Sequence, residues 1–439
     1  MPTAHLIEGA APVITTLGVR LRMERGLRMA LFVALCAILI FGPLAMGAVD
    51  DWSIAILEIG AAAILSIWMA WQLAAAAVRV RWSPLFAPML VFFGLVAAQI
   101  AFHRTAYPHD SISELWRYIA YGILTFAAVQ LVQADGKVVP RFAYVMAAFG
   151  SVYAVFAVLQ GFTSDGQIYW QLKPRAGSVY GSYVNHNHYA GLMELILPIA
   201  MALAFGGWVR GAKRILLGFA AVLMAASVFL SQSRGGMFAV IVETVFLAAF
   251  WAPRFSRRKS AAIFLSFCLV TASFLAWVAP QQVGNRISDI HDPARWLIHR
   301  DSIGMFAAHP ILGSGFGTFA TVFPRYRSFF DGFLANNAHD DYLELLLECG
   351  LAGFGIAVWF LVVVYREGIR NFRRARQSRT AMISAAALAG CTGLLAHSFT
   401  DFNLHIPANA AWFYVLCAIA TASGDRGSAA NARISPDGD

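Results

Sequence analysis

Apolar runs long enough to cross a bilayer recur along almost the whole chain and limit what it can fold into. A spanning helix needs roughly 17–25 mostly apolar residues, because its backbone polar groups must be satisfied within the segment. About twelve such runs are found, at residues 29–49, 54–78, 84–102, 115–133, 141–161, 189–208, 214–231, 236–252, 261–280, 351–365, 381–398 and 408–422. Only 13% of the residues are charged, about half the usual fraction in soluble proteins. The sequence therefore predicts an all-α, polytopic integral membrane protein with about 12 transmembrane helices.

Basic residues between these runs orient the predicted helices. Most of the 33 Lys and Arg residues fall in alternate, mainly short segments, which is the positive-inside pattern and predicts that both termini are cytoplasmic. The net charge of +9 then reflects membrane orientation and gives no indication of nucleic-acid binding. The five cysteines show no CxxC spacing, so they define neither a disulfide framework nor a zinc site.

The same pattern divides the chain into five parts. They are a cytoplasmic tail (1–28), nine transmembrane helices (29–280), a large outer loop with short helices (281–350), three further transmembrane helices (351–422) and a disordered cytoplasmic tail (423–439). The outer segments carry the unusual polar residues. This asymmetry predicts binding or chemistry on the outer side of the membrane.

The segment 336–354, NNAHDDYLELLLECGLAGF, closes the large outer loop. His339, Asp340 and Asp341 fall where a loop should pass into a helix, and acidic residues suit a helix start because its exposed N–H groups favour negative charge. The plainer interpretation is a capped amphipathic helix that dips into the bilayer. The other outer segments decide whether this one has a chemical role.

Two other outer segments have compositions that suit a ligand. The segment 161–187 combines Arg175, three tyrosines including Tyr183, and an amide–imidazole run that begins at Asn185; aromatic rings with such donors suit a sugar. An interfacial aromatic belt explains the same residues, and the HxH pair of this segment lacks a third metal ligand.

The tight turn SQSRGG holds Arg234, which suits a phosphate because the glycines allow close approach and a helix follows. The alternative is an arginine that extends to the membrane surface.

The large outer loop adds two further arginines of interest. Arg295 and Arg300 lie on a predicted amphipathic helix over residues 292–308. The glycines of GSGFGTF resemble a dinucleotide loop only superficially, because no strand precedes them, and they predict a turn. The last outer turn, residues 397–407, can line the same cavity, although its spacing does not require this.

Arginine, histidine and carboxylate together fit the displacement of a diphosphate. Arginine binds a diphosphate bidentately and stabilises the charge that grows as it leaves. Histidine can take the proton of an incoming hydroxyl, and a neighbouring carboxylate fixes its tautomer. One base and one diphosphate clamp suffice for inversion at an anomeric carbon, so we expect no metal and no cofactor.

Four pieces of the chain, in this order, carry a resemblance: RAGSVYGSYVNHNHYAG, SQSRGG, HPILGSGFGTF and NNAHDDYLELLLECGLAG. Together, over roughly residues 175–365, they resemble the bacterial O-antigen ligase and O-antigen polymerase superfamily. Its members are multi-span enzymes that act on undecaprenyl-diphosphate-linked glycans at the periplasmic face of the inner membrane. The resemblance therefore implies an inner-membrane protein whose outer loop and active site are periplasmic.

The resemblance also implies roles for particular residues. The family's first essential arginine matches Arg234, and the second matches Arg300, with Arg295 as the alternative. The family's histidine, which would activate the acceptor hydroxyl, matches His339. These three positions form the expected catalytic set. The expected substrate-binding residues are Arg175, Tyr183, Asn185, Arg295, Asp340 and Asp341.

The expected activity is transfer of a glycan from a polyprenyl-diphosphate carrier to an acceptor hydroxyl. The acceptor is a lipid A core sugar for a ligase in lipopolysaccharide biosynthesis, a lipid-linked glycan for a polymerase, or a protein hydroxyl. Asp340 and Asp341 after the histidine resemble the exopolysaccharide and polymerase branch. A secondary transporter of an anionic solute shares the twelve-span layout, but it predicts charged or broken helices near mid-membrane. Glu194 and Glu243 are the main charges within the predicted spans.

Overall fold

The structure is a computed structural model. It describes residues 10–75, 77–174, 177–251, 293–330, 334–375 and 378–422, with short stretches between 258 and 273 and position 332. In this part of the chain the regular structure is helical, and the β contacts are three isolated bridges. The predicted all-α class is therefore confirmed for the described residues.

Eight described helices are long and apolar enough to cross a membrane. They are α2 (Ala10–Leu44), α3 (Asp51–Ala75), α5 (Pro108–Ala134), α6 (Val138–Thr163), α7 (His186–Phe205), α8 (Ala212–Leu230), α14 (Asp341–Arg374) and α15 (Arg379–His397). Three other apolar helices are α4 (Phe86–Ala101), α9 (Arg234–Trp251) and α16 (Pro407–Ala420). Each predicted span other than 261–280 falls on one of these helices. That segment lies largely outside the described residues, and α4 and α16 have 16 and 14 residues, so twelve spans remain a prediction.

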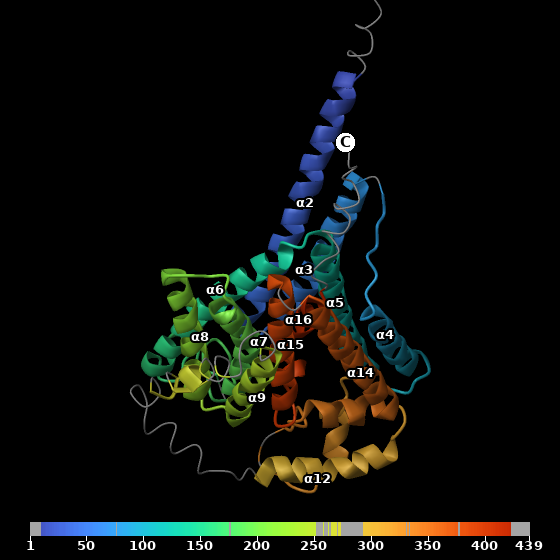
Figure 1. The fold of residues 1–439 in the computed structure, drawn as a ribbon. Helices are drawn as coiled ribbons and strands as arrows, with labels where there is room; N and C mark the ends of the chain where they lie inside the picture. Colours follow the sequence, from blue (N-terminus) through green and yellow to red (C-terminus); the bar gives the residue numbers. More distant parts are fainter. Residues whose placement is uncertain are drawn as a thin grey trace, which may run out of the picture.

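Helices α7 and α15 form the centre of the bundle, and α2 and α3 lie at its edge (Figure 1). Within the spanning windows, 94% of α7 and 83% of α15 is buried, against 33% of α2 and 28% of α3. Close approach explains the glycines between the central helices. A Cβ on Gly390 of α15 would lie 2.9–3.0 Å from the carbonyl oxygens of Glu194 and Leu195 in α7.

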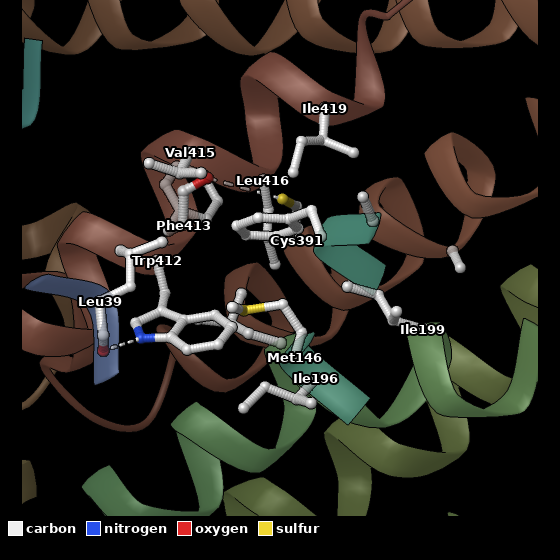
Figure 2. Packing of buried hydrophobic residues seen from close by; sticks show 14 of the residues in the cluster. Leu39, Met146, Ile196, Ile199, Cys391, Trp412, Phe413, Val415, Leu416 and Ile419 are labelled. Carbon is white, nitrogen blue, oxygen red and sulfur yellow. Dashed lines mark hydrogen bonds between the residues drawn. The ribbon is translucent and has the colours of Figure 1, made fainter. Parts of the chain in front are cut away.

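Trp412 of α16 joins the central helices to the edge of the bundle (Figure 2). Its indole is fully buried near Met146 and Ile196, and its Nε1–H donates a hydrogen bond of 2.7 Å to the carbonyl of Leu39 in α2. A buried tryptophan needs such a partner for its N–H, whereas its ring supplies a large apolar contact area. The core that positions the helix ends is therefore continuous from α2 to α16.

Helix α14 begins where the sequence predicts, at the acidic pair after His339. The Asp340 carboxylate caps the helix by accepting from the N–H groups of Tyr342 and Leu343. The helix is interrupted at Gly350, whose φ of 62° is left-handed and whose missing Cβ leaves room for the backbone of Ile311. This break lets the backbone of residues 310–311 pack against the middle of the helix.

Helix α12 (Pro293–Ala308) matches the predicted helix 292–308 and lies across one end of the bundle, crosswise to α14 (Figure 1). Short helices α13 (Phe319–Val322) and η1 (Phe323–Arg325) follow it, and η2 (Asn403–His405) precedes α16. The glycines of GSGFGTF form the predicted turn. Its backbone N–H groups at Gly317 and Phe319 bind the Glu348 carboxylate at 2.9 and 2.8 Å.

Candidate functional site

A polar cavity of about 450 Å³ lies between α12 and the ends of α7, α9 and α15. Its walls come from the first residues of α7 and α9, from α12, from the segment before α14, and from the end of α15 with the following turn. The lining residues are His186, Asn187, Gln232, Arg234, Gly235, Phe238, Arg295, His299, His339, His397, Phe399 and Thr400. Segments more than two hundred residues apart in sequence therefore meet in one site.

Arg234 enters the cavity as the first residue of α9. The preceding Ser233 caps the helix, since its Oγ accepts from the N–H of Gly236 at 3.1 Å. Before it, Gln232 has a φ of 63°, a left-handed conformation that is uncommon outside glycine. His186 Nδ1 lies 2.6 Å from the carbonyl oxygen of Ser231 and holds the turn from the α7 side. The arginine and the helix start thus present positive charge to the same space.

Arg295 and His299 enter the cavity from α12. They are four residues apart, so they lie on one face of the helix. Arg295 Nη1 donates to the carbonyl of Thr400 at 2.5 Å, and His299 Nε2 is 3.1 Å from the carbonyl of Ala338. These contacts tie α12 to the turn after α15 and to the residue before His339.

Arg300 lies on another face of α12 and does not line the cavity. Its guanidinium binds the Asp301 carboxylate at 2.9 and 3.0 Å, contacts the Ser328 hydroxyl, and lies 5.4 Å from the centre of the Trp296 ring. Its side chain is 44% exposed. Of the two candidate loop arginines, Arg295 therefore shares a cavity with Arg234, and Arg300 does not.

The backbone around His339 is fixed on both sides. The Glu344 carboxylate accepts from the N–H of Ala338 at 2.7 Å and from the side chain of Asn337 at 3.0 Å, and His299 contacts the Ala338 carbonyl. His339 itself has a φ of 56°. A left-handed histidine held by its neighbours is the kind of local strain that clusters at functional sites. The side chain is 31% exposed and reaches the cavity.

The Asp401 carboxylate faces His339. Its Oδ1 lies 3.9 Å from His339 Nδ1 and 3.5 Å from His188 Nε2, and Asn187 Nδ2 donates to its Oδ2. The Phe402 ring lies edge-on to both histidine rings, with centroids 4.8 and 5.0 Å away. Asp401 is fully buried, just behind the cavity wall.

The surroundings of Asp401 keep it ionised. Burial opposes ionisation, but contact with His188 and the charges of His188, His397 and Arg295 outweigh it, so the pKa of Asp401 lies well below its ordinary value near 3.8. No Asp or Glu is among the described residues that line the cavity itself. Two arginines and four histidines therefore face it, which favours an anionic ligand.

Metal ligation was the weaker interpretation of the HxH pair. In the described parts of the chain, no three His, Cys, Asp or Glu side chains are grouped as a metal site. His186 lines the cavity, whereas His188 contacts Asp401 and Phe402. His186 therefore belongs to the cavity lining, and His188 to the layer of residues behind it.

The other expected substrate-binding residues lie away from the cavity. Tyr183 is buried and donates to Asn409 Oδ1 at 2.8 Å, and Asn185 caps α7 by accepting from the N–H of Asn187. Asp340 caps α14, and Asp341 binds His405 Nδ1 at 2.8 Å. Arg175 lies outside the described residues. Asp340 and Asp341 thus have structural contacts, and Asp401 occupies the position beside His339 that we had expected a sequence neighbour to fill.

Sequence reasoning missed several residues of the cavity and its wall. His299 was recognisable, because it lies four residues after Arg295 on a predicted helix. His186 and Asn187 were noted, but for a metal or a sugar rather than for this wall. The last outer turn, residues 397–407, was expected to be able to line this cavity, and His397 and Thr400 do so. No local signal gave the contacts of Asp401 and His397, whose partners lie about 60 to 214 residues away.

The region of the chain that matches a known protein family forms one side of this cavity. Residues 219–359 match the family model described as O-antigen ligase, and no curated protein matches the chain. The matched region contains Arg234, Arg295, His299 and His339. The wall formed by α7 and α15 lies outside it. The matched region contains three of the four pieces that carry the resemblance, and it supports a relationship of residues 219–359 to the O-antigen ligase and polymerase superfamily.

Proposed function

We propose that the protein is a membrane glycosyltransferase that moves a glycan from a polyprenyl-diphosphate carrier to an acceptor hydroxyl in the described cavity. The observation that carries this proposal is the meeting of Arg234, Arg295 and His339 in one acid-free cavity. These groups come from three separate elements of the chain.

The two arginines would bind the diphosphate of the donor. Arg234 adds its guanidinium to the N–H groups at the start of α9, and Arg295 approaches from α12 across the cavity. Bidentate guanidinium contacts stabilise the negative charge that develops on the diphosphate as the sugar leaves. This role uses Arg295 in place of Arg300, whose guanidinium is engaged with Asp301.

His339 would act as the general base. Its Nδ1 is turned toward Asp401, which leaves Nε2 to receive the proton of the acceptor hydroxyl. The acceptor oxygen then forms a bond to the anomeric carbon, and the bond from that carbon to the diphosphate oxygen breaks with its electron pair on the oxygen. The ionised Asp401 stabilises the imidazolium that results. A single displacement of this kind inverts the anomeric centre.

The proposed donor and acceptor are those of the family that residues 219–359 resemble, and the apolar helices support a donor held in a membrane. The donor would be an undecaprenyl-diphosphate glycan in the bacterial inner membrane, with the cavity at the periplasmic face and both termini in the cytoplasm. A lipid A core sugar as acceptor would make the protein an O-antigen ligase. A second lipid-linked glycan would make it a polymerase of O-antigen or exopolysaccharide, with the same chemistry.

The position of the cavity favours transfer over solute transport. A secondary transporter binds its solute near the bilayer midplane, at broken helices. Here the lining residues occupy helix ends: His186 and Arg234 begin α7 and α9, and His397 ends α15. A reaction between a lipid headgroup and a sugar would take place near the membrane surface, where the ends of spanning helices lie.

Complementation of a deletion strain tests the proposal. We expect Arg234→Ala, Arg295→Ala and His339→Ala to abolish surface glycan while they insert at normal levels, which a blot of the membranes checks. Arg300→Ala is the matched control and should retain glycan. Accumulation of unattached polymer would indicate a ligase, and single repeat units a polymerase. Normal glycan with all three variants would refute the transferase.

A further inference from the structure

A buried histidine–glutamate pair lies directly beneath the Arg234 turn. His397, the last residue of α15, has its Nδ1 2.8 Å from Glu194 Oε1 of α7. Their side chains are 1% and 0% exposed. The proposed mechanism uses neither group, and both lie outside the region that matches the family model.

The other side of the imidazole faces the start of α9. His397 Nε2 is 3.5 Å from Ser233 Oγ, the atom that caps the helix that begins with Arg234. Gly235 has no side chain to intervene, and a Cβ there would overlap the imidazole ring. A contact path therefore runs from Glu194 through His397 and Ser233 to the backbone that carries Arg234.

The burial of Glu194 indicates a charged partner. Its second oxygen, Oε2, has no hydrogen-bond partner within the described part of the chain. A buried carboxylate is costly unless a cation compensates it, and the nearest group able to do so is the His397 imidazole. As an imidazolium, His397 would donate from both nitrogens, to Glu194 and to Ser233, and add positive charge to the floor of the cavity.

We propose that Glu194 and His397 form a buried ion pair that positions the Arg234 turn and strengthens diphosphate binding. The inference rests on the proposed function, because it assigns these residues to the donor's diphosphate. Both are positioning residues, since His397 reaches the cavity floor with almost none of its surface exposed. A hydrogen bond without charge is the competing account, and it predicts that a neutral amide can replace Glu194.

Glu194→Gln separates charge from shape. The glutamine keeps an oxygen that can accept from His397 and loses the negative charge. Glu243→Gln is the matched control: Glu243 is also fully buried, but it lies nine residues beyond Arg234, about 13 Å along α9. No described hydrogen bond links it to His397.

The experiment measures binding of geranylgeranyl diphosphate to the purified full-length protein, together with donor and acceptor KM in a transfer assay. We expect Glu194→Gln to weaken diphosphate binding and raise donor KM about tenfold, with acceptor KM unchanged. Glu243→Gln should stay within about twofold of wild type. Equal binding by wild type and Glu194→Gln, with Arg234→Ala defective, would overturn the inference and leave the proposed function intact.

Two further arms keep the test decisive. If Glu194→Gln does not accumulate, Ser233→Ala removes the bridging hydroxyl without altering the pair, and it should weaken diphosphate binding. Unchanged binding by Ser233→Ala would then overturn the inference. Failure of the wild-type protein to bind the diphosphate would refute the proposed function and the inference with it.

Discussion

Two histidine–carboxylate contacts cross between the same two segments of the chain and differ in almost every respect. His339 faces Asp401 at 3.9 Å, and His405 faces Asp341 at 2.8 Å. In sequence, His339 lies two residues before Asp341, and His405 lies four residues after Asp401. His339 is 31% exposed at the cavity, whereas His405 is 16% exposed and also lies 3.4 Å from Glu344.

The difference between them separates a chemical role from a structural one. The His405 contact is at hydrogen-bond distance and is reinforced by a second acid, so both imidazole nitrogens face carboxylates. The His339 contact is longer than a hydrogen bond and has room for a substrate beside it. Hydrogen bonds at catalytic sites often tighten only when substrate is bound. The His405 contact therefore holds α14 against η2, and the His339 contact leaves its imidazole able to take a proton.

The largest effect is expected from His339→Gln, which keeps a polar side chain but cannot act as a base. The rate of glycan transfer should fall about 10²- to 10⁴-fold. Thermal unfolding in detergent should be unchanged, since the side chain is partly exposed. A variant that transfers glycan at the wild-type rate would contradict the assignment of the base.

For His405→Gln we expect a loss of stability with little change in the rate of glycan transfer. Loss of the imidazolium leaves Asp341 and Glu344 buried without their cation, which should reduce the free energy of unfolding by about 3 kcal/mol. The turnover of the fraction that remains folded should be near wild type. Unfolding monitored by intrinsic fluorescence, with active protein counted by binding of a diphosphate probe, separates the two quantities.

Asp401→Asn should have an intermediate effect on the rate. The amide keeps the shape and removes the charge that stabilises a protonated His339, so transfer should fall about 10- to 100-fold. Asp340→Asn is the matched control, because asparagine caps a helix as well as aspartate does. Equal rates for the two variants would remove Asp401 from the mechanism.

Arg295→Lys and Arg300→Lys should differ in donor KM, by a smaller factor than the rates above. Lysine keeps the charge at residue 295 but loses bidentate geometry, so donor KM should rise about tenfold. The same change at residue 300 should alter it by no more than about twofold, since that side chain is outside the cavity. A larger defect at residue 300 would reverse the assignment of the loop arginine.

The smallest effect is the pH dependence of stability, to which the two contacts contribute in opposite directions. Burial opposes protonation of His405, but Glu344 and Asp341 raise its pKa well above the ordinary value of 6.5. Its stabilisation is therefore complete below about pH 6.5 and is lost as pH rises through the raised pKa, at about 1.4 kcal/mol per pH unit at most. Asp401, whose pKa is lowered, stabilises the protein above about pH 4 and less as pH falls further. Unfolding of wild type against His405→Gln from pH 5 to 10 should show the two curves converge on the alkaline side.

Much of the helical arrangement could be predicted because the sequence signals for helix positions are local. Apolar runs gave the helix positions, the acids after His339 gave the start of α14, and amphipathic spacing gave α12 to within one residue. The grouping of Arg234 with His339 could be expected from their shared position at the outer ends of spans. Their meeting in one cavity agrees with that expectation.

The remainder depends on tertiary packing that short-range patterns do not encode. Arg295 and Arg300 lie on the same helix, and only the rotation of α12 against the turn after α15 decides which one faces Arg234. Asp340 and Asp341 are neighbours of His339 in sequence, but the helix start directs them to a cap and to His405. The carboxylate beside His339 comes from 62 residues away, which no local spacing indicates.

Chemical rescue of His339→Ala tests the central claim most directly. The cavity of about 450 Å³ can admit imidazole in place of the missing side chain. In proteoliposomes with a polyprenyl-diphosphate glycan donor, we predict that added imidazole restores transfer by His339→Ala in proportion to its unprotonated fraction, and does not restore it in Asp401→Ala. Transfer that imidazole leaves unchanged in His339→Ala, or restores equally in both variants, would contradict the role of His339 as the base.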